Sequence, residues 1–468
     1  MPISLPMFAK RSLKPVGLAV MMATTTLSCS ASTPAQESPQ PNALIKSIAL
    51  DNVWSGHRVK PYLLTRGKHQ FVAYFDANRQ MTVAHREGAN PWRYYKVDSW
   101  LGWDSHNYVT LEVDKEGYIH LIGNMHADPL EYFRSSEPYQ VRSLQRVEVM
   151  VDKSVEKRMT YPIFLLNKNN DLIVKYRDGG SGNGNEIYNI YDTSTQTWRR
   201  LHTNQFLDGQ GLMSGYFEGP VLGPDGNFHL IWVWRNTPSA DSNHSLSYAT
   251  SPDLVSWFDS NGNTLELPLT LDKVEIVDPV PPKGGMINGN VKIGFDQQQR
   301  PVISYHKYDE DGDTEIFVAR KEGKGWKTSQ LSEWDGFRWE FGGHGSLGRF
   351  PVRPSAPVVL DDKNLGVTVR KDDSILQFVV DSETLATVRV ENTSLYPAEI
   401  DAVSRKSNQK MLQDTAYPFE LHVQAGSGQA SSGNQFYLSW FSQPGNRDRA
   451  HTSISLPGVL LVHEFAQQ

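Results

Sequence analysis

Seven segments of the chain repeat one pattern, in which a short apolar run rich in β-branched and aromatic residues follows a polar turn. Most of these turns carry Gly, Asn or Asp, which is typical of the second strand of a β-hairpin. The seven runs are HQFVAYFD (69–76), YIHLIGN (118–124), DLIVKYR (171–177), NFHLIWVW (227–234), RPVISYH (300–306), LGVTVR (365–370) and NQFYLSW (434–440). No amphipathic helix pattern interrupts them, so the sequence predicts an all-β chain of repeated hairpins.

The spacing of these runs indicates the architecture. Their starts are separated by 49, 53, 56, 73, 65 and 69 residues. A repeat of about 40–50 residues that holds several strands is the pattern of a β-propeller. Seven units therefore predict a seven-bladed β-propeller over residues 44–468, with insertions in the later blades. A two-domain β-sandwich is the alternative that the pattern leaves open.

The first 43 residues differ from the repeats. A few basic residues precede the uncharged, mostly apolar segment 15–27. That segment is shorter than the roughly 20 residues that span a bilayer, and it is typical of a secretory signal. We expect 1–29 to be this signal and the Ser- and Pro-rich segment 30–43 to be a flexible linker. Cys29 directly follows the apolar segment, which leaves open either lipidation of Cys29 or plain cleavage near Ala31.

Composition narrows the class of protein further. The chain has 468 residues, 46 Lys+Arg against 52 Asp+Glu, and a formal charge of -6. This mild acidity argues against a nucleic-acid partner, which usually meets a basic face. The single cysteine excludes an internal disulfide framework and any Cys-rich metal site. We expect an exported monomer that is either secreted or held at the cell surface or outer membrane by a lipid anchor.

The hairpins predict which side chains meet. Residues at equal distances from a turn lie side by side, with opposed Cα atoms about 4.5–5.5 Å apart. His106 and His126 lie ten residues before and after Glu116, at the centre of one turn. Tyr161 and Arg177 are related in the same way by the turn of the next hairpin. In a propeller such strand ends share one face, so we expect these four side chains to converge at the mouth of the central channel.

Further polar residues occupy corresponding places. The next hairpins pair Tyr216 with Arg235, and Asn290 with His306. Basic residues near the channel mouth could receive sulfate groups, and plain surface charge is the alternative. The predicted substrate-binding residues are Asn107, Tyr216, Arg235, Asn290, His306, Lys307 and Arg349.

Other polar and aromatic residues have simpler interpretations. His120 and His229 sit at equivalent repeat positions, and we expect both to be packing residues. The acidic segment 309–313 fits a polar turn better than a calcium loop. The aromatic segment 334–339 could stack on sugar rings or fill a gap between blades.

The predicted cluster suits one reaction. The sequence has no nucleophile elbow, phosphate loop or zinc-protease motif, and no pair of acids at the same strand ends that would indicate a glycosidase. A tyrosine, histidines and an arginine suit β-elimination beside a uronate carboxylate. Arg177 would pair with that carboxylate, and His106 and Tyr161 would move the protons. Which of these two is the base is left open, and His126 would orient a partner or bind the sugar.

Several motifs resemble a known family. They are Trp103–Asn107, Gly123–His126, Thr160–Phe164, Lys175–Gly184, Leu246–Asp253 and the segment 348–351. They resemble the BNR-4 propeller family, and from about residue 45 to 465 the chain is most similar to the ulvan lyases of polysaccharide lyase family 25, with family 24 close by.

The resemblance implies a seven-bladed propeller that cuts ulvan between 3-sulfated rhamnose and a uronic acid and leaves an unsaturated uronate. It implies that His106 and Tyr161 are the acid/base pair, that Arg177 neutralises the carboxylate and that His126 supports the site. No cofactor is required, although some relatives carry a structural metal.

Two further hypotheses stay open at this point. One is a lyase for another uronate polymer, such as glucuronan. The other is a non-catalytic sugar-binding lipoprotein on the same scaffold. A sialidase-like hydrolase is disfavoured, because the chain has no strong Asp-boxes and no evident nucleophile.

Overall fold

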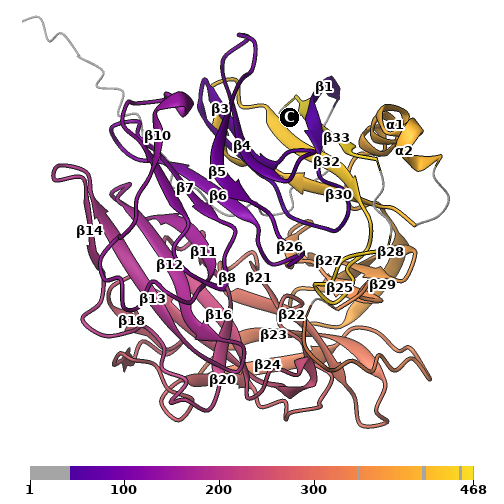
Figure 1. The fold of residues 1–468 in the computed structure, drawn as a ribbon. Helices are drawn as coiled ribbons and strands as arrows, with labels where there is room; N and C mark the ends of the chain where they lie inside the picture. Colours follow the sequence, from indigo (N-terminus) through magenta and orange to yellow (C-terminus); the bar gives the residue numbers. More distant parts are fainter. Residues whose placement is uncertain (1–42, 346, 414–417, 453–455, 467–468) are drawn as a thin grey trace, which may run out of the picture. The chain divides into compact units, whose positions relative to one another are not determined.

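The computed structural model describes residues 43–466 apart from 346, 414–417 and 453–455, and the described chain folds into seven β-sheets (Figure 1). The predicted signal, Cys29 and all but the last residue of the predicted linker lie outside the described residues. In the part of the chain that is described, no helix is long and apolar enough to cross a membrane.

The first three sheets follow one another along the chain. Sheet 1 contains β2 (Tyr62–Gly67), β3 (His69–Phe75), β4 (Gln80–Glu87), β5 (Arg93–Trp100) and β31 (Ser427–Ala430), which joins β2 in parallel. Sheet 2 contains β6 (Val109–Val113), β7 (Ile119–Gly123), β9 (Tyr132–Ser135) and β10 (Leu144–Arg146). Sheet 3 contains β8 (His126–Asp128), β11 (Met159–Leu166), β12 (Leu172–Gly180), β13 (Asn183–Asp192) and β14 (Thr197–Arg200).

Sheets 4 to 6 continue this order. Sheet 4 contains β15 (Ser214–Leu222), β16 (Phe228–Arg235), β17 (Asn243–Ser251), β18 (Trp257–Phe258), β19 (Thr264–Leu265) and β20 (Glu275–Asp278). Sheet 5 contains β21 (Lys292–Phe295), β22 (Pro301–Tyr308), β23 (Thr314–Glu322) and β24 (Gly325–Gln330). Sheet 6 contains β25 (Val352–Pro354), β26 (Val358–Val359), β27 (Asn364–Lys371), β28 (Ser374–Asp381) and β29 (Thr387–Asn392).

Sheet 7 joins the two ends of the described chain. It contains β30 (Glu420–Ala425), β32 (Gln435–Ser442), β33 (Gly458–Phe465) and β1 (Leu44–Val53). The first strand, β1, pairs antiparallel with the last, β33, and the indigo and yellow ribbons lie side by side in Figure 1. The sheet therefore closes by backbone hydrogen bonds between segments that are distant in sequence.

All seven apolar runs of the sequence are strands, namely β3, β7, β12, β16, β22, β27 and β32. They read as nearly continuous apolar runs because the sheets bury them on both faces, and every residue of β7 and β16 is buried. The expectation of an all-β chain of hairpins is confirmed.

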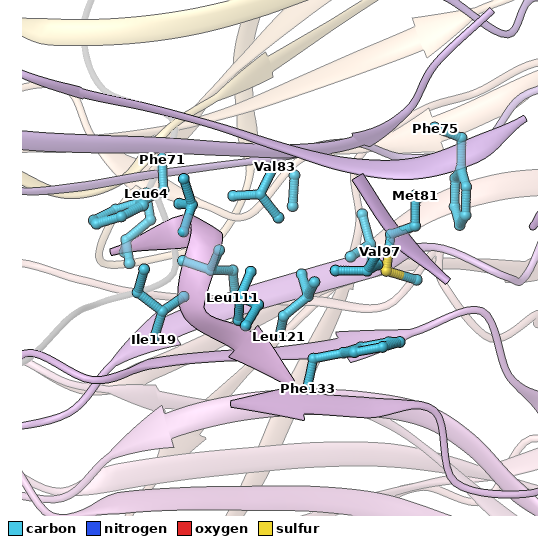
Figure 2. Close-up of a cluster of buried hydrophobic side chains, with 14 of the residues drawn as sticks. Leu64, Phe71, Phe75, Met81, Val83, Val97, Leu111, Ile119, Leu121 and Phe133 are labelled. Carbon is cyan, nitrogen blue, oxygen red and sulfur yellow. The ribbon is translucent and has the colours of Figure 1, made fainter. Parts of the chain in front are cut away.

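The hydrophobic core lies between successive sheets. One cluster joins Leu64 and Phe71 of sheet 1 to Leu111 and Leu121 of sheet 2 (Figure 2). Similar clusters join sheets 2 and 3, 3 and 4, 4 and 5, and 5 and 6. A further cluster packs Trp440 of sheet 7 against sheet 1. Sheets 1 to 6 thus pack each on the next and sheet 7 packs on sheet 1, which differs from the paired sheets of a β-sandwich.

The sequence pattern missed two helices, α1 (Ala398–Ser407) and α2 (Gln409–Leu412). Four positions at helical spacing are buried here, Ile400, Ser404, Asn408 and Met411. Two of them are polar and bond across to sheet 7, as Ser404 Oγ does to Ser439 Oγ at 2.7 Å. Because two of these four buried positions are polar, the sequence shows no clear helical repeat of hydrophobic residues here.

Candidate functional site

Four side chains predicted to converge do meet at one end of sheets 2 and 3. The ring centroids of His106 and His126 are 4.3 Å apart. The ring of Tyr161 lies 6.0 Å from His106 and 5.7 Å from His126. The guanidinium carbon of Arg177 lies 5.0 Å from the Tyr161 ring centroid. The predicted proximity of these four residues is confirmed, and we name them the catalytic cluster after the role that we propose for them below.

The histidines come together by a route that the hairpin argument did not contain. Strands β6 and β7 pair in the predicted register, with Val109 opposite Gly123. The chain then crosses from sheet 2 to sheet 3, where His126 in β8 pairs with Thr160 of β11. The crossing passes through Asn124, which has a positive φ of 61°. His126 is therefore held by the backbone of sheet 3.

Tyr161 projects into the catalytic cluster from a β-bulge. Strand β11 pairs with β12 in the predicted register near the turn, but the register shifts between Thr160 and Ile163. As a result Thr160, and not Tyr161, lies opposite Arg177. Tyr161 has a φ of 55°, an unusual value for a side chain of its size. Bulges re-aim side chains, and this one turns the phenol toward the imidazoles.

Asp104 is a central residue of the site that the sequence analysis did not single out. Its Oδ1 accepts a hydrogen bond from Nδ1 of His106 at 2.6 Å, and its Oδ2 accepts one from Nδ1 of His126 at 2.6 Å. Burial favours a raised pKa for Asp104, but the bonds and charges of the two imidazoles outweigh burial and hold the pKa well below its usual range. The carboxylate thus fixes both rings, and the Asp-x-His spacing was the available signal.

A loop that is distant in sequence supports His106. Asp448, between β32 and β33, accepts hydrogen bonds from the backbone nitrogen and Oγ of Ser105. Its Oδ2 lies 3.7 Å from Nδ1 of His106. The site therefore includes a contribution from sheet 7 that no local pattern could indicate.

Arg177 is the most unusual group in the catalytic cluster. Its side chain is 2% exposed, and all three guanidinium nitrogens are buried without a hydrogen-bond partner among the described residues. The guanidinium carbon lies over the rings of Tyr161, at 5.0 Å, and Tyr216, at 5.4 Å. Gly184 leaves room for the stem, because a side-chain carbon there would lie 2.9 Å from two carbons of Arg177. The donors of this cation are thus buried and unused.

Tyr161, which lies between Arg177 and the two histidines, is a protonated group at neutral pH. Burial raises the pKa of Tyr161 strongly and Tyr216 adds to the rise, while the nearby Arg177 and Arg235 oppose it without cancelling it. The hydroxyl of Tyr216 shares a 2.6 Å hydrogen bond with Oγ of Ser181. Tyr161 can therefore donate a proton at neutral pH.

Two further predicted binding residues lie close to the catalytic cluster. Asn107 is buried and donates from Nδ2 to Oδ1 of Asn124, at the crossing between sheets. The predicted pairing of Tyr216 with Arg235 is wrong, because Tyr216 lies opposite Val233 and Arg235 opposite Ser214, but the guanidinium carbon of Arg235 still lies 5.2 Å from the Tyr216 ring. Arg235 donates to the carbonyl oxygens of the loop that follows it, Thr237, Pro238 and Ser239.

The other predicted binding residues are engaged elsewhere. Nε2 of His306 accepts a 3.0 Å hydrogen bond from Nδ2 of Asn290, and burial lowers the pKa of His306 to about 3. Lys307 forms a 2.6 Å ion pair with Asp278. Arg349 is exposed and forms a 2.7 Å ion pair with Asp373. The structure brings none of these four into contact with the catalytic cluster.

The simpler interpretations of other residues agree with the structure. His120 bonds to Tyr132 and Asp114, and His229 bonds to Tyr248 and Asp225, so both are buried packing residues with equivalent partners. The carboxylate of Asp309 accepts hydrogen bonds from the backbone of its own turn. The aromatic segment 334–339 packs against the core between sheets 5 and 6 and fills a gap there.

Three donors of the site could hold a metal ion. The ligand atoms of Asp104, His106 and His126 lie within 4.8 Å of one another. Both carboxylate oxygens, however, already accept hydrogen bonds from the Nδ1 atoms. An ion at these Nδ1 atoms would have to replace those hydrogen bonds.

A cavity of about 420 Å³ opens elsewhere, at the hairpin turns of sheets 2 and 3. It is lined by residues that include Lys115 and Asp171, which form a 2.5 Å ion pair, and Arg199. These turns are at the opposite ends of the strands from the catalytic cluster. The residues that line the cavity include no imidazole and no unpartnered buried cation, in contrast to the catalytic cluster.

Comparisons with known proteins agree with the fold. The chain is 28% identical over 236 residues to the long isoform of an ulvan lyase from Pseudoalteromonas sp. (strain PLSV), covering 40% of this chain and 23% of that protein. It is 27% identical over 139 residues to the short isoform from Alteromonas sp. (strain LOR), covering 27% of this chain and 26% of that protein. The matches thus span about a quarter of the relatives' length.

Solved structures resemble the whole described fold. The polysaccharide lyase Uly1 has a TM-score of 0.62 at 11% identity, covering 92% of this chain and all of that one. An ulvan lyase of polysaccharide lyase family 25, solved bound to -[GlcA(1-4)Rha3S]-, has a TM-score of 0.58 at 13% identity, covering 89% of this chain and 95% of that one.

A family model provides the assignment. Residues 69–334, which run from β3 of sheet 1 to the end of sheet 5, match the model described as BNR repeat-containing family member. This match covers more than half of the chain and includes every residue of the catalytic cluster. The chain therefore belongs to the BNR repeat-containing family.

Proposed function

We propose that this chain is a polysaccharide lyase that cleaves ulvan by β-elimination between 3-sulfated rhamnose and glucuronic acid. The observation that carries the proposal is the guanidinium of Arg177, buried without a partner beside two imidazoles and a phenol. An unpaired buried cation is costly to keep. A carboxylate matches the guanidinium fork with two parallel hydrogen bonds, so a uronate is the ligand that this site fits.

The remaining groups divide the proton transfers between them. Nδ1 of His106 donates to Asp104, which leaves the lone pair of Nε2 available as the base for the C5 proton. The electrons of the C5–H bond form the C4=C5 double bond while the C4–O4 bond breaks. Tyr161, kept protonated by its raised pKa, donates its proton to O4. Arg177 stabilises the negative charge that develops on the carboxylate.

The geometry supports glucuronate as the sugar. H5 and O4 of glucuronate lie on the same side of the ring, so base and acid must approach from one face. The rings of His106 and Tyr161 are 6.0 Å apart in adjacent sheets, which suits that demand. His126 is held by the same carboxylate as His106 and would orient or bind the sugar.

The relatives support the substrate. Several curated relatives carry the name ulvan lyase, and one structural neighbour was solved with -[GlcA(1-4)Rha3S]-. The reaction as proposed requires no cofactor, because Arg177 supplies the positive charge at the carboxylate. A structural metal ion elsewhere in the chain is compatible with this mechanism.

We extend the proposal to the whole chain. The seven sheets would be seven blades around one axis, with the catalytic cluster at the mouth of the central channel. The protein would be exported as a monomer, and Cys29 would carry a lipid anchor if the signal is of the lipoprotein kind. The repeat spacing supports the seven blades, and the apolar segment 15–27 followed by Cys29 supports export and the lipid anchor.

Ultraviolet absorbance at the band of unsaturated uronates tests the proposal. We expect the purified chain to raise this absorbance with ulvan, and His106→Ala to abolish the rise. His344→Ala is the control, since its exposed side chain lies outside the catalytic cluster. A flat trace with new reducing ends would indicate hydrolysis and contradict the proposal.

Substrate profiling separates the alternatives. Equal rates on unsulfated glucuronan would favour a lyase for another uronate polymer. Tight binding of ulvan without any product would favour a non-catalytic sugar-binding protein.

A further inference from the structure

Two arginines of sheet 6 occupy the place that Thr160 and Arg177 occupy in sheet 3. Arg353 of β25 lies directly opposite Arg370 of β27, near the start of β25. Thr160 of β11 lies opposite Arg177 of β12 in the same way. Neither Arg353 nor Arg370 belongs to the catalytic cluster, and neither was singled out in the sequence.

A third arginine joins them from sheet 1. Arg58 lies in the segment that precedes β2. Burial, and then repulsion from Arg58 and Arg370, lowers the pKa of Arg353 to about 9. The same three cations, after burial, push the pKa of the nearby His422 well below its usual value. Arg58 therefore adds to the positive charge around Arg353 and Arg370.

The three charges are poorly compensated. The Nε atoms of Arg353 and Arg370 are buried without a hydrogen-bond partner among the described residues. Glu420 of sheet 7 opposes the lowered pKa of all three arginines, and Asp373 opposes that of Arg370. Arg370 also donates from Nη2 to the carbonyl oxygen of Phe350 at 3.0 Å. The guanidinium of Arg353 is held over the ring of Phe350 at 4.4 Å. Arg353 is thus a fixed cation with an unused donor beside other cations, and an anion is the ligand that such a group binds.

This arginine group is connected to the surroundings of the catalytic cluster. The ring centroid of His57, next to Arg58 in sequence, lies 5.5 Å from that of Trp103, which precedes Asp104 in the chain. The loop that carries Asp448 also carries Arg447, which donates to the carbonyl oxygen of Gly342 at 3.1 Å, in the segment leading to sheet 6. The arginine group and the catalytic cluster therefore share supporting segments while they lie on different sheets.

We propose that Arg58, Arg353 and Arg370 form an anion subsite that binds a sulfate ester of the polysaccharide, away from the bond that is cut. The inference rests on the proposed function, because it takes ulvan as the ligand. A sulfate accepts several hydrogen bonds at once and would cancel the repulsion among the three guanidinium groups. A uronate carboxylate of the same polymer offers the same charge with fewer acceptors.

The first test separates binding from folding. Arg353→Met removes the charge and keeps the contact with Phe350, and Arg389→Met on the exposed outer strand of the same sheet is the matched control. In a His106→Ala background, which prevents cleavage, we expect Arg353→Met to weaken the Kd for ulvan about tenfold. Its Tm should stay the same or rise, because repulsion is relieved. An unchanged Kd for ulvan, whatever the Tm of the variant, would overturn the subsite.

The second test identifies the anion. With chemically desulfated ulvan, we expect the parent protein and Arg353→Met to bind equally weakly. A tenfold difference that persists on the desulfated polymer would assign the site to carboxylates and overturn the sulfate assignment.

A third readout does not depend on ulvan. We expect sodium sulfate to raise the Tm of the wild-type chain and of Arg389→Met more than sodium chloride of equal ionic strength does, and to raise the Tm of Arg353→Met less. If sulfate changes the Tm values in this way but the chain does not bind ulvan, the proposed function is contradicted while Arg58, Arg353 and Arg370 remain a site for sulfate. Cleavage of ulvan with no effect of Arg353→Met in any assay would overturn the subsite alone.

Discussion

Arg177 and Arg235 sit at corresponding strand ends of neighbouring sheets, and both face the ring of Tyr216, at 5.4 and 5.2 Å. Both are nearly buried, with 2% and 9% of the residue exposed. Arg235 donates to three carbonyl oxygens of its own loop, whereas Arg177 has no hydrogen-bond partner among the described residues. The same residue type at a similar place in the repeat thus holds a loop in sheet 4 and keeps its donors unused in sheet 3.

The next sheet extends the comparison. Asn290 and His306 bond to each other, and Asn290 also donates to the carbonyl of Val352. Their polar atoms are largely used within the protein, as those of Arg235 are. Position in the repeat therefore indicates which residues reach the strand ends, and the partners of each residue indicate which of them are available to substrate.

The largest effect should follow removal of the groups that move protons. We expect His106→Ala and Tyr161→Phe each to lower kcat on ulvan by about a hundredfold to ten-thousandfold, because each removes one proton transfer. Initial rates of ultraviolet absorbance measure this, with circular dichroism as the check on folding. If either variant kept most of the wild-type rate, the reaction would not occur at the catalytic cluster.

Asp104→Asn should cause a smaller loss of rate. The substitution keeps the shape of the side chain but weakens its hydrogen bonds to both imidazoles. We expect the rate to fall about tenfold to a hundredfold, as misplaced catalytic groups do. The variant should also lose about 1–3 kcal/mol of unfolding free energy at pH 7, because hydrogen bonds to a charged group are lost.

The pH dependence of that stability has a definite sign. Since the pKa of Asp104 is lower in the folded chain, its contribution is complete above the unfolded value of about 3.9 and disappears as the pH falls through the folded value. Denaturant unfolding from pH 7 downward should therefore bring the wild type and Asp104→Asn together at acidic pH. A gap that widens on acidification would contradict the assigned charge.

Arg235→Met should affect stability more than catalysis. We expect the unfolding free energy to fall by about 1–3 kcal/mol, because the carbonyl oxygens of its loop lose their donors. The rate on ulvan should fall less than tenfold. Paired denaturation and rate measurements test this, and a thousandfold loss of rate in a stable variant would place Arg235 beside Arg177 in function.

The smallest effect should come from chelation. We expect EDTA to leave the rate on ulvan unchanged, since Arg177 carries the positive charge at the carboxylate. A loss that is restored by one divalent cation would contradict this and point to Asp104, His106 and His126, whose ligand atoms lie within 4.8 Å of one another.

The sequence predicted what depends on local pattern. The apolar second strands and their turns are local, and they place His106 near His126 and Tyr161 near Arg177. The bulge at Tyr161 and the crossing of His126 into sheet 3 follow from pairing between strands, which the periodicity does not encode.

Other features depend on side-chain partners or on distant segments. Asp104 was quoted within a motif, but its role requires both histidines to be in place. Asp448 reaches Ser105 from a loop over three hundred residues away in sequence. The predicted binding roles of Lys307 and Arg349 rested on charge alone, and their carboxylate partners were invisible in the sequence.

The most direct test compares Arg177→Met with Arg235→Met on ulvan by the initial rate of ultraviolet absorbance. We expect Arg177→Met to lose about a hundredfold to a thousandfold in rate, because the charge that develops on the carboxylate is no longer stabilised. Its Tm should stay the same or rise, since an unpaired buried cation is removed. An Arg177→Met protein that still raises the absorbance at nearly the wild-type rate would contradict the role of Arg177 as the carboxylate partner.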